Sequence, residues 1–257
     1  MIGRVIDGRF TIQSVLGRGG MGVVYRAHQA SLERSVALKV MTGVPPEREA
    51  EFQRRFFLEA ATAAKLKHPN TITVFDYGSD LFPLSPSEVG DGERLFFIAM
   101  ELLEGVPLQK LVGRGQMLHP QRAVHIALQM SRSLREAHRA GVVHRDLKPG
   151  NIMLVKQDDA DDVEGDFVKV LDFGLAKVGP GQGARPIEGL TKAGTFMGSP
   201  RYVAPEQVEG RPVDARADIY SLGCILYRML SGRVPFDGKS PVEIMLKHLH
   251  EEVPPLA

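Results

Sequence analysis

The sequence has little cysteine, no tryptophan and no long apolar run. Its 257 residues include one cysteine, Cys224. One cysteine excludes an intrachain disulfide, and with it the class of disulfide-stabilised secreted domains. The first residues, MIGRVIDGRF, lack the apolar stretch of a secretory signal, and the runs LFFIAMELL and IYSLGCILY are far shorter than the about 20 residues that cross a bilayer. We therefore expect a cytoplasmic location and no membrane contact within this segment.

An excess of charge of either sign is also missing. The 32 Lys and Arg residues balance 31 Asp and Glu residues, which leaves a formal net charge of +1. This balance gives no electrostatic reason to expect a nucleic acid or an anionic membrane as partner. A hydrophobic share of 43% and a charged share of 25% are typical of a soluble folded protein, and the length fits one large domain or two small ones.

The two halves of the chain differ in periodicity. Short β-prone runs alternate with glycine-rich turns from 10 to 40 and return at TITVFDYG and RLFFIAMELL, which predicts an antiparallel sheet. Apolar residues at helical spacing predict one amphipathic helix from Pro46 to Lys67. The second half is mainly helical, with helices predicted at 121–140, at 218–230, and from Ser240-Pro241 to about His250.

Two of these helices carry specific packing expectations. In 121–140 the apolar stripe includes Val124 and Leu128, so we expect both to face the core. The helix at 218–230 is apolar nearly all round, which is typical of a central helix buried on every side, and Asp218 at its start suits an N-cap. Cys224 lies within this helix and is expected in the core rather than as a reactive thiol.

The first chemical signal is a glycine-rich loop between two β-prone runs. Gly17, Gly19 and Gly22 form a GxGxxG pattern, and glycines let a backbone approach phosphate groups closely. A dinucleotide-binding fold would need a helix after this pattern, whereas a β-prone run follows. By itself the pattern leaves a phosphate-binding loop and a hairpin without a ligand equally open.

A second signal is a lysine within an apolar strand. Lys39 ends the run Val-Ala-Leu-Lys. A lysine there usually faces solvent; the other interpretation is a buried ammonium with an acidic partner and an anion to hold. Glu59, in the middle of the following helix, suits the role of that partner.

The third signal decides between these alternatives. The chain contains His144-Arg145-Asp146-Leu147-Lys148-Pro149-Gly150-Asn151, then Leu171-Asp172-Phe173-Gly174, then Ala204-Pro205-Glu206. In this order, after the glycine loop and the lysine strand, the motifs resemble those of the eukaryotic-like (Hanks-type) serine/threonine protein kinases, and GRGGMGVVYRAH with HRDLKPGNIML resembles their bacterial branch. The resemblance spans about Arg9 to Pro255.

The resemblance implies an α+β, bilobal protein-kinase-like fold. The N-lobe would comprise residues 1–103, with a small antiparallel sheet, one helix and a hinge at its end. The C-lobe would comprise residues 104–257 and be larger and mainly helical. Kinases of this type continue with further helices, which include an arginine partner for Glu206. We therefore expect a fragment of a longer receptor-like protein, the cytoplasmic part of a membrane-anchored one, with part of the 218–230 helix uncovered. The alternative is a kinase that has lost these helices and has a weakened C-lobe.

The resemblance also assigns catalytic roles, and these fit the chemistry, because the transition state of phosphoryl transfer needs positioned cations and an oriented nucleophile. Asp146 would orient the substrate hydroxyl, and Lys148 would neutralise the moving phosphoryl group. Asn151 and Asp172 would hold Mg²⁺, or Mn²⁺ in its place, since hard cations prefer oxygen ligands. Asp218 resembles the buried aspartate that anchors the backbone of the catalytic loop.

Other assignments concern ATP. Lys39, once paired with Glu59, would hold the α and β phosphates, and the backbone of Gly17, Gly19 and Gly22 would cover them. Adenine needs an apolar slot and an exposed backbone edge. The residues that the resemblance implies for this slot and edge are Val24, Ala37 and Met153, the gatekeeper Met100, and the hinge residues Glu101 and Leu103.

Regulation is implied by Arg145, which marks the RD type of kinase, in which a cationic pocket receives a phosphorylated residue of the activation loop. That loop runs here over 172–206. Thr191 and Thr195 are its expected phosphorylation sites, with exposed loop hydroxyls as the alternative. Ser199 would face the catalytic loop.

We therefore expect an ATP- and Mg²⁺-dependent protein serine/threonine kinase of bacterial signalling. It would phosphorylate its own activation loop, for which a homodimer is one arrangement. The alternative is a nucleotide-binding pseudokinase or scaffold, but pseudokinases typically lose at least one of four residues that this chain keeps: Lys39, Asp146, Asn151 and Asp172. A small-molecule kinase is a third candidate. The Ala-Pro-Glu motif and the Ser199 segment favour a protein substrate, because they build a peptide-facing platform.

Overall fold

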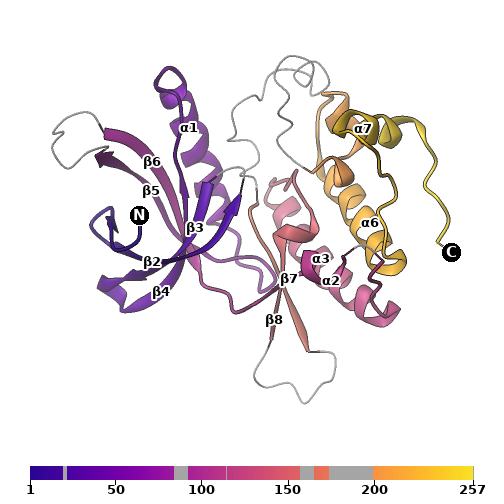
Figure 1. Cartoon of the computed structure of the whole chain (residues 1–257), viewed down its shortest axis with the longest axis horizontal. Coiled ribbons are helices and arrows are strands. Elements are labelled where there is room, and N and C mark those ends of the chain that lie inside the picture. The colour runs from indigo at the N-terminus through magenta and orange to yellow at the C-terminus, as the bar shows by residue number, and fades with distance from the viewer. Residues whose placement is uncertain (20–21, 84–91, 114, 157–164, 174–198, 257) are drawn as a thin grey trace. The chain divides into compact units, whose positions relative to one another are not determined.

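A computed structural model describes residues 1–19, 22–83, 92–113, 115–156, 165–173 and 199–256, which divide into two compact units (Figure 1). Within the described residues, the first unit comprises Met1–Lys67 and Ile72–Leu103. The second unit comprises His68–Thr71 and the residues from Glu104 onward. The four residues at 68–71 therefore pack with the second unit, although the first unit's chain continues on both sides of them.

The first unit is built on a six-stranded antiparallel sheet in the order β1-β2-β3-β4-β6-β5. The elements are β1 (Val5–Ile6), β2 (Phe10–Gly19), β3 (Gly22–Gln29), the 3-10 helix η1 (Ala30–Leu32), β4 (Arg34–Met41), β5 (Val74–Pro83) and β6 (Gly92–Glu101). Successive side chains of a strand point to opposite faces. One face carries a buried apolar core that includes Phe10, Ile12, Tyr25, Leu38 and Phe97. The antiparallel sheet predicted for this part of the chain is confirmed.

Helix α1 (Pro46–Ala63) packs on the other face of this sheet. The rings of Phe52 and Phe56 lie 4.8 and 5.3 Å from the ring of Phe96 on β6, centroid to centroid. The helix ends before the predicted Lys67 because the chain tightens into i→i−3 hydrogen bonds, such as that from Leu66 N to Ala63 O at 3.1 Å.

The second unit is mainly helical and also contains a small antiparallel sheet. Its longer helices are α3 (Pro120–Arg139), α6 (Ala215–Ser231) and α7 (Pro241–His250), and α3 runs beside α6 (Figure 1). The sheet has the order β7-β8-β9, with β7 (Gly105–Pro107), β8 (Ile152–Lys156) and β9 (Asp166–Val170). The shorter helical elements are α2 (Leu108–Leu111), η2 (Pro149–Asn151), η4 (Pro200–Tyr202) and α5 (Pro205–Val208).

The buried face of α3 differs from the apolar stripe predicted for it. Val124 and Leu128 are 49% and 52% exposed. In their place the polar side chains of Gln129 and Ser133 are buried. The prediction was wrong on these positions because an apolar pattern cannot register polar residues that face the interior and find partners there.

These two polar residues hold the segment 68–71 against the rest of the second unit. Gln129 Oε1 accepts hydrogen bonds from Asn70 Nδ2 at 2.8 Å and from Val168 N at 2.9 Å. The hydroxyls of Ser133 and Thr71 lie 2.7 Å apart. Because a buried polar group without a partner is costly, these bonds make the polar interior of α3 compatible with folding.

Helix α6 begins three residues before its predicted start. Its N-cap is Asp214, whose Oδ1 accepts the backbone N–H of Arg216 at 2.9 Å, and its C-cap is Gly232, with a φ of 69°. Asp218 is therefore not the N-cap; it lies in the first turn and is fully buried. The neighbouring Ile219 is 54% exposed, so the helix is not buried on every side as its composition suggested.

Helix α7 starts at the predicted cap, where Ser240 Oγ accepts the backbone N–H of Glu243 at 3.1 Å. Near its end, the imidazole of His248 is 5% exposed and its Nδ1 lies 2.6 Å from the hydroxyl of Tyr220. The ring of Phe236 packs edge-on against it at 4.8 Å. Burial lowers the pKa of His248 to about 4, so the ring is neutral at pH 7.

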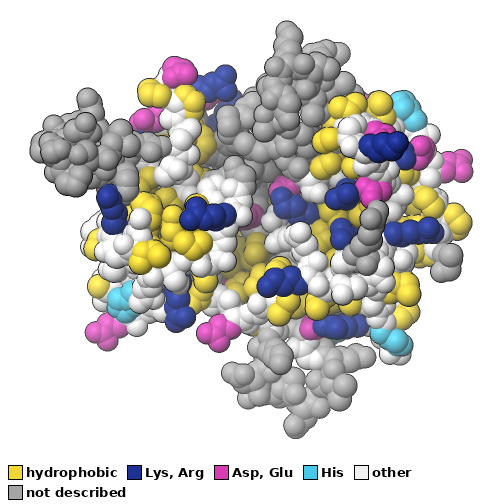
Figure 2. Space-filling view, in the orientation of Figure 1, with side chains coloured by type: hydrophobic (Ala, Val, Ile, Leu, Met, Phe, Trp, Pro, Cys, Tyr) yellow, Lys and Arg dark blue, Asp and Glu magenta, His cyan; other side chains and the backbone are white. Residues whose placement is uncertain are grey.

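The described surface and the single thiol agree with the composition. On the face that Figure 2 draws, Lys and Arg side chains are spread among apolar and acidic ones rather than gathered in a stripe. In the part of the chain that the structure describes, no helix is long and apolar enough to span a bilayer. Cys224 is buried in α6 as predicted, and burial raises the pKa of its thiol to about 12.

Candidate active site

Three residues of the HRDLKPGN motif lie together in the second unit, in the segment of chain that connects α3 with β8. Lys148 Nζ is 2.5 Å from Asp146 Oδ2. Asn151, which is 8% exposed, donates from Nδ2 to the backbone carbonyl of Asp146 at 2.8 Å. This bond leaves the amide oxygen of Asn151 as its acceptor group. The structure thus brings a carboxylate, an ammonium and an amide into one cluster.

The segment 171–173 is held next to this cluster by hydrogen bonds from both backbone groups of Leu171. Leu171 N donates to the carbonyl of Asn151 at 2.8 Å, and Leu171 O lies 2.8 Å from Nε2 of His144. The ring of Phe173 packs 4.9 Å from the ring of His144, and both are buried. Asp172, between Leu171 and Phe173, is therefore held beside the segment 144–151, the expected catalytic loop.

Two residues of the site have a left-handed backbone. The φ angles are 67° for Arg145 and 58° for Asp172. A non-glycine residue in this region costs on the order of 1–3 kcal/mol, and it persists only where surrounding contacts impose it. Such strain is concentrated at functional sites, which is consistent with the position of both residues in the motifs.

Asp218 supplies contacts that impose this backbone. Its Oδ2 accepts the backbone N–H of His144 and its Oδ1 accepts that of Arg145, both at 2.9 Å, and His138 Nε2 lies 2.7 Å from Oδ2. Burial raises the pKa of Asp218, but the hydrogen bonds from His138 and the loop backbone outweigh burial, so the net shift is downward and the carboxylate is ionised. The anchoring contact expected of Asp218 is confirmed, whereas no sequence pattern indicated the contact between Asp218 and His138.

The segment 199–204 is fastened to α6. Ser199 is the half-buried N-cap of η4. Tyr202 O accepts Ser221 Oγ at 2.6 Å, and Tyr202 OH lies 2.5 Å from Arg228 Nη1. Arg228 also donates from Nε to Val112 O at 2.7 Å. Sequence reasoning missed Arg228, because partners 26 and 116 residues away produce no periodic signal.

In the first unit, the expected nucleotide-binding residues share one face of the sheet. Lys39 on β4 pairs with Val24 on β3 and Ile98 on β6, and Ala37 pairs with Met100. The residues between them belong to the apolar core on the opposite face, so alternation places these residues on the face that α1 covers. Lys39 is 6% exposed, and Glu59 on α1 is half-buried.

The glycines of the loop differ in what the fold requires of them. Gly22 has a φ of 138°, and a Cβ added there would lie 2.1 Å from Val40 O, so only glycine fits. A Cβ on Gly17 or Gly19 would meet no atom within 4 Å. The first unit itself therefore needs glycine at 22, whereas the other two glycines border open space.

The remaining expected residues are spread along the chain. Glu101 ends β6, where its Oε1 accepts Thr73 N at 2.6 Å, and Leu103 follows half-buried. Met153 lies on β8 of the second unit. Arg145 Nε is buried and has no hydrogen-bond partner among the described residues. Thr191 and Thr195 lie outside the described residues.

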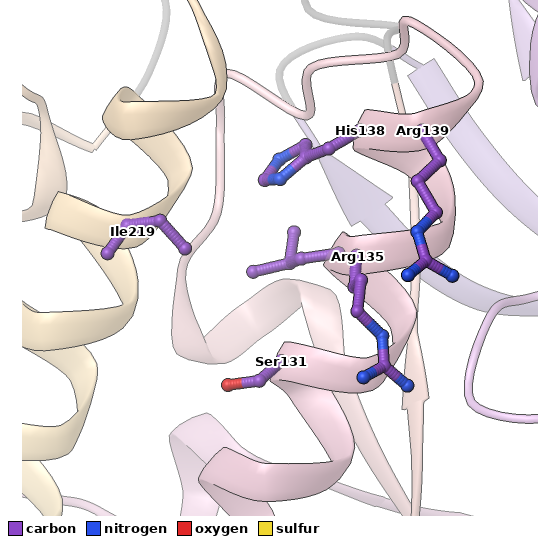
Figure 3. Close-up of a pocket in the computed structure, with 6 residues that line it drawn as sticks. Ser131, Arg135, His138, Arg139 and Ile219 are labelled. Carbon is purple, nitrogen blue, oxygen red and sulfur yellow. The ribbon is translucent and has the colours of Figure 1, made fainter.

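A separate pocket of about 430 Å³ lies between α3 and α6. Its lining residues are Ser131, Leu134, Arg135, His138, Arg139 and Ile219. In Figure 3, His138 and Ile219 extend into the space between the two helices, while Arg135 and Arg139 extend to the other side of α3. None of the residues that the sequence assigned to catalysis, ATP or metal lines this pocket.

Comparisons with known proteins agree on one family. The family model described as "Protein kinase domain" matches residues 10–255. The chain is 42% identical over 257 residues to serine/threonine-protein kinase pkn3 of Myxococcus xanthus, covering 99% of this chain and 43% of that protein. It is 37% identical over 254 residues to serine/threonine-protein kinase PrkC of Bacillus subtilis, covering 99% of this chain and 35% of that protein. The chain thus spans less than half the length of these relatives.

The solved structures agree with the sequence comparisons. The crystal structure of a mutant of the Mycobacterium tuberculosis PknI kinase domain matches with a TM-score of 0.66 and 29% identity. The match covers 92% of this chain and 79% of that one. The fold of these residues is therefore the fold of a solved bacterial kinase domain.

Proposed function

The chain belongs to the protein kinase domain family, and on this premise we propose that it is a serine/threonine protein kinase that transfers the γ-phosphoryl group of ATP to Ser and Thr hydroxyls of proteins. The observation that carries the proposal is the cluster of Asp146, Lys148 and Asn151, with the segment 171–173 fastened to it. Relatives in Myxococcus xanthus and Bacillus subtilis are named serine/threonine-protein kinases, which supports the same activity in bacterial signalling.

The proton and the charge of the reaction would be handled by two side chains. Asp146 would accept a hydrogen bond from the substrate hydroxyl and orient its oxygen toward the phosphorus. Lys148, whose ammonium lies 2.5 Å from that carboxylate, would place positive charge beside the transferred phosphoryl group.

The residues Asn151 and Asp172 fit a hard divalent cation. One offers an amide oxygen and the other a carboxylate, the donor types that Mg²⁺ prefers and Mn²⁺ accepts. Bound there, the cation would neutralise charge on the phosphate oxygens. The amide nitrogen of Asn151 donates to the carbonyl of Asp146, so its amide oxygen is the atom that would bind the metal. The anchored neighbours of Asp172 would limit its reorganisation on binding.

ATP binding is proposed for the residues that share one face of the first sheet. Lys39 would contact the α and β phosphates with Glu59 as its partner, and the open space next to Gly17 and Gly19 would admit the phosphates to the backbone N–H groups. The apolar residues Val24, Ala37 and Met100, with Met153 of the second unit, would contact adenine, and the backbone of Glu101 and Leu103 would hydrogen-bond its edge.

Regulation is proposed for the activation loop. Arg145 would receive a phosphate on Thr191 or Thr195, and its buried Nε, which has no partner within the described ranges, supports an anion at this place. Ser199 would face Asp146 and Lys148. Phosphorylation of one copy by another would make a homodimer the working arrangement.

A cytoplasmic location is part of the same proposal, because ATP is the phosphoryl donor. The proposal also takes the chain as the catalytic part of a longer protein, since it covers 43% of its Myxococcus xanthus relative.

The test is transfer of a labelled γ-phosphoryl group to the chain itself and to a basic generic protein, with Asp172→Asn as the control. We expect incorporation that maps to Thr191 or Thr195 by mass spectrometry and disappears in the control. Equal labelling by the parent chain and by Asp172→Asn would contradict the kinase assignment. So would the absence of label from both the parent chain and the generic protein. A nucleotide-binding scaffold predicts ATP binding without incorporation; the presence of Lys39, Asp146, Asn151 and Asp172 together does not favour it.

A further inference from the structure

The side chain of Gln207 joins two parts of the second unit that are far apart in sequence. Its Nε2 donates to the carbonyl of Arg145 at 2.9 Å, and its Oε1 accepts the backbone N–H of Ala204 at 3.1 Å. We propose that Gln207 is a positioning residue for Asp146, which it acts on through the Arg145–Asp146 peptide. This inference rests on the proposed kinase function.

The geometry goes beyond a helix cap. Gln207 is the third residue of α5, and a side chain there commonly reaches back to the N-cap backbone, here Ala204. That capping bond uses only the amide oxygen, and a glutamate would supply it equally well. The amide nitrogen is left over, and it donates to a carbonyl 62 residues earlier in the chain. The second bond gives a reason for an amide rather than a carboxylate at this position.

The carbonyl that Gln207 holds belongs to the peptide that carries the N–H of Asp146. A peptide unit is planar, so fixing its carbonyl also fixes the direction of its N–H and the attachment of the next Cα. That N–H is the donor in a bond to His144 Nδ1 at 3.3 Å. The peptide before Asp146 is therefore held at both its polar groups, at the carbonyl by Gln207 and at the N–H by His144.

The residue before this peptide is strained, which makes the clamp necessary. Arg145 has a φ of 67°, and its own N–H is held by Asp218. Without Gln207, the carbonyl of Arg145 loses this partner, and the backbone is freer to relax toward an ordinary φ. Relaxation would rotate Asp146 relative to Lys148. Small displacements of a catalytic group cost large factors in rate, since a misplacement of about 1 Å costs up to about 100-fold.

The other end of Gln207 lies at the segment that we propose to face the protein substrate. Ala204 lies two residues beyond the end of η4, and η4 is fastened to α6 through Tyr202. One side chain thus connects the substrate-facing segment with the peptide before Asp146. We therefore expect Gln207 to affect phosphoryl transfer to protein and to have little effect on the affinity for ATP, because neither of its two hydrogen-bond partners, Arg145 and Ala204, is a residue that we propose to bind ATP or the metal.

The test compares Gln207→Glu with Gln207→Leu. The glutamate keeps the acceptor for Ala204 and loses the donor to Arg145, whereas leucine loses both. At pH 7.5 we expect Gln207→Glu to lower kcat for a protein substrate about 10-fold or more, with KM for ATP within about twofold and an unchanged melting temperature. A protonated glutamate regains an O–H donor. The deficit of this variant relative to the parent should therefore narrow toward pH 5.5, whereas that of Gln207→Leu should not.

The outcomes separate the two proposals. A parent chain that transfers phosphate while Gln207→Glu matches its kcat would overturn the role of Gln207 and leave the kinase assignment intact. Parallel losses of kcat, ATP affinity and melting temperature in both variants would show a purely structural residue, and so would a pH-independent deficit in Gln207→Glu. A parent chain without transfer would overturn the kinase assignment, and the positioning role with it.

Discussion

The imidazole of His138 lies 2.7 Å from the buried carboxylate of Asp218, Nε2 to Oδ2. The same carboxylate accepts two successive backbone N–H groups of the catalytic loop. One acid of α6 therefore links a side chain of α3 with the strained loop that carries Asp146. Because the pKa of Asp218 is lowered in the folded chain, folding favours its ionised form.

Asp218→Asn should lower the free energy of unfolding by on the order of 3 kcal/mol at pH 7, because the amide turns a donor toward groups that are themselves donors. Urea denaturation measures this loss. The contribution of Asp218 is present above the ordinary carboxyl pKa and is lost as pH falls through the lower folded value. Asp214→Asn is the control, since asparagine caps a helix as well as aspartate does. Equal losses in the two variants would contradict the anchoring role.

His248 should make the chain less stable in mild acid. Its folded pKa is about 4, below the ordinary value of 6.5, so between these values the unfolded chain binds a proton that the folded chain does not. The stabilising effect of the neutral ring is complete above pH 6.5 and falls by about 2–3 kcal/mol as pH approaches 4. The stability advantage of the parent over His248→Gln should therefore shrink across this range. The matched control is His250→Gln, which removes an exposed imidazole of the same helix and leaves the interior intact. An advantage over His248→Gln that stays constant from pH 7 to pH 4 would contradict the burial effect.

Lys39→Met should lower the rate of phosphoryl transfer by about 100-fold or more, while the fold is kept. The buried ammonium is the phosphate contact of the proposal, whereas the methionine stem fills the same space on the sheet. Initial rates with labelled ATP and circular dichroism test the two halves of this statement. Lys65→Met, at an exposed position two residues beyond α1, should stay within about twofold of the parent rate. An unchanged rate in Lys39→Met would remove Lys39 from the ATP site.

The glycines of the loop should separate folding from nucleotide binding. Gly22→Ala should lower the free energy of unfolding by about 2 kcal/mol or more, because of its φ and the approach of Val40 O. Gly19→Ala meets open space and should change stability by less than about 0.5 kcal/mol, yet weaken ATP binding. Thermal unfolding without nucleotide and ATP titration give the two quantities. A large loss of stability in Gly19→Ala would show that this glycine serves the fold.

Much of the site could be predicted from the sequence, because its residues lie in short motifs. The placement of Asp146, Lys148 and Asn151 within one short stretch makes their proximity a local matter. The face on which Lys39 lies could be predicted for a similar reason, since the alternation of side chains within 36–40 decides which of them share a face. The antiparallel sheet and the long helices followed from periodicity for the same reason.

Features that depend on distant partners could not be predicted. The burial of Gln129 depends on Asn70 and Val168, which are 59 and 39 residues away. Arg228 interrupts an apolar helix, and its partners lie on other elements. The exposure of Ile219 depends on which neighbouring element covers α6. Such residues follow from tertiary packing, which leaves no mark on local composition.

The burial of Cys224 has a practical consequence. A thiol with a pKa of about 12 is protonated at neutral pH and, enclosed in α6, reacts slowly with maleimides and other electrophiles. No other cysteine competes with it. A cysteine introduced at any exposed position would therefore take up a fluorophore or a spin label alone, and the parent chain would serve as the unlabelled blank. Pairs of such positions would then report on nucleotide-induced movement without removal of any native residue.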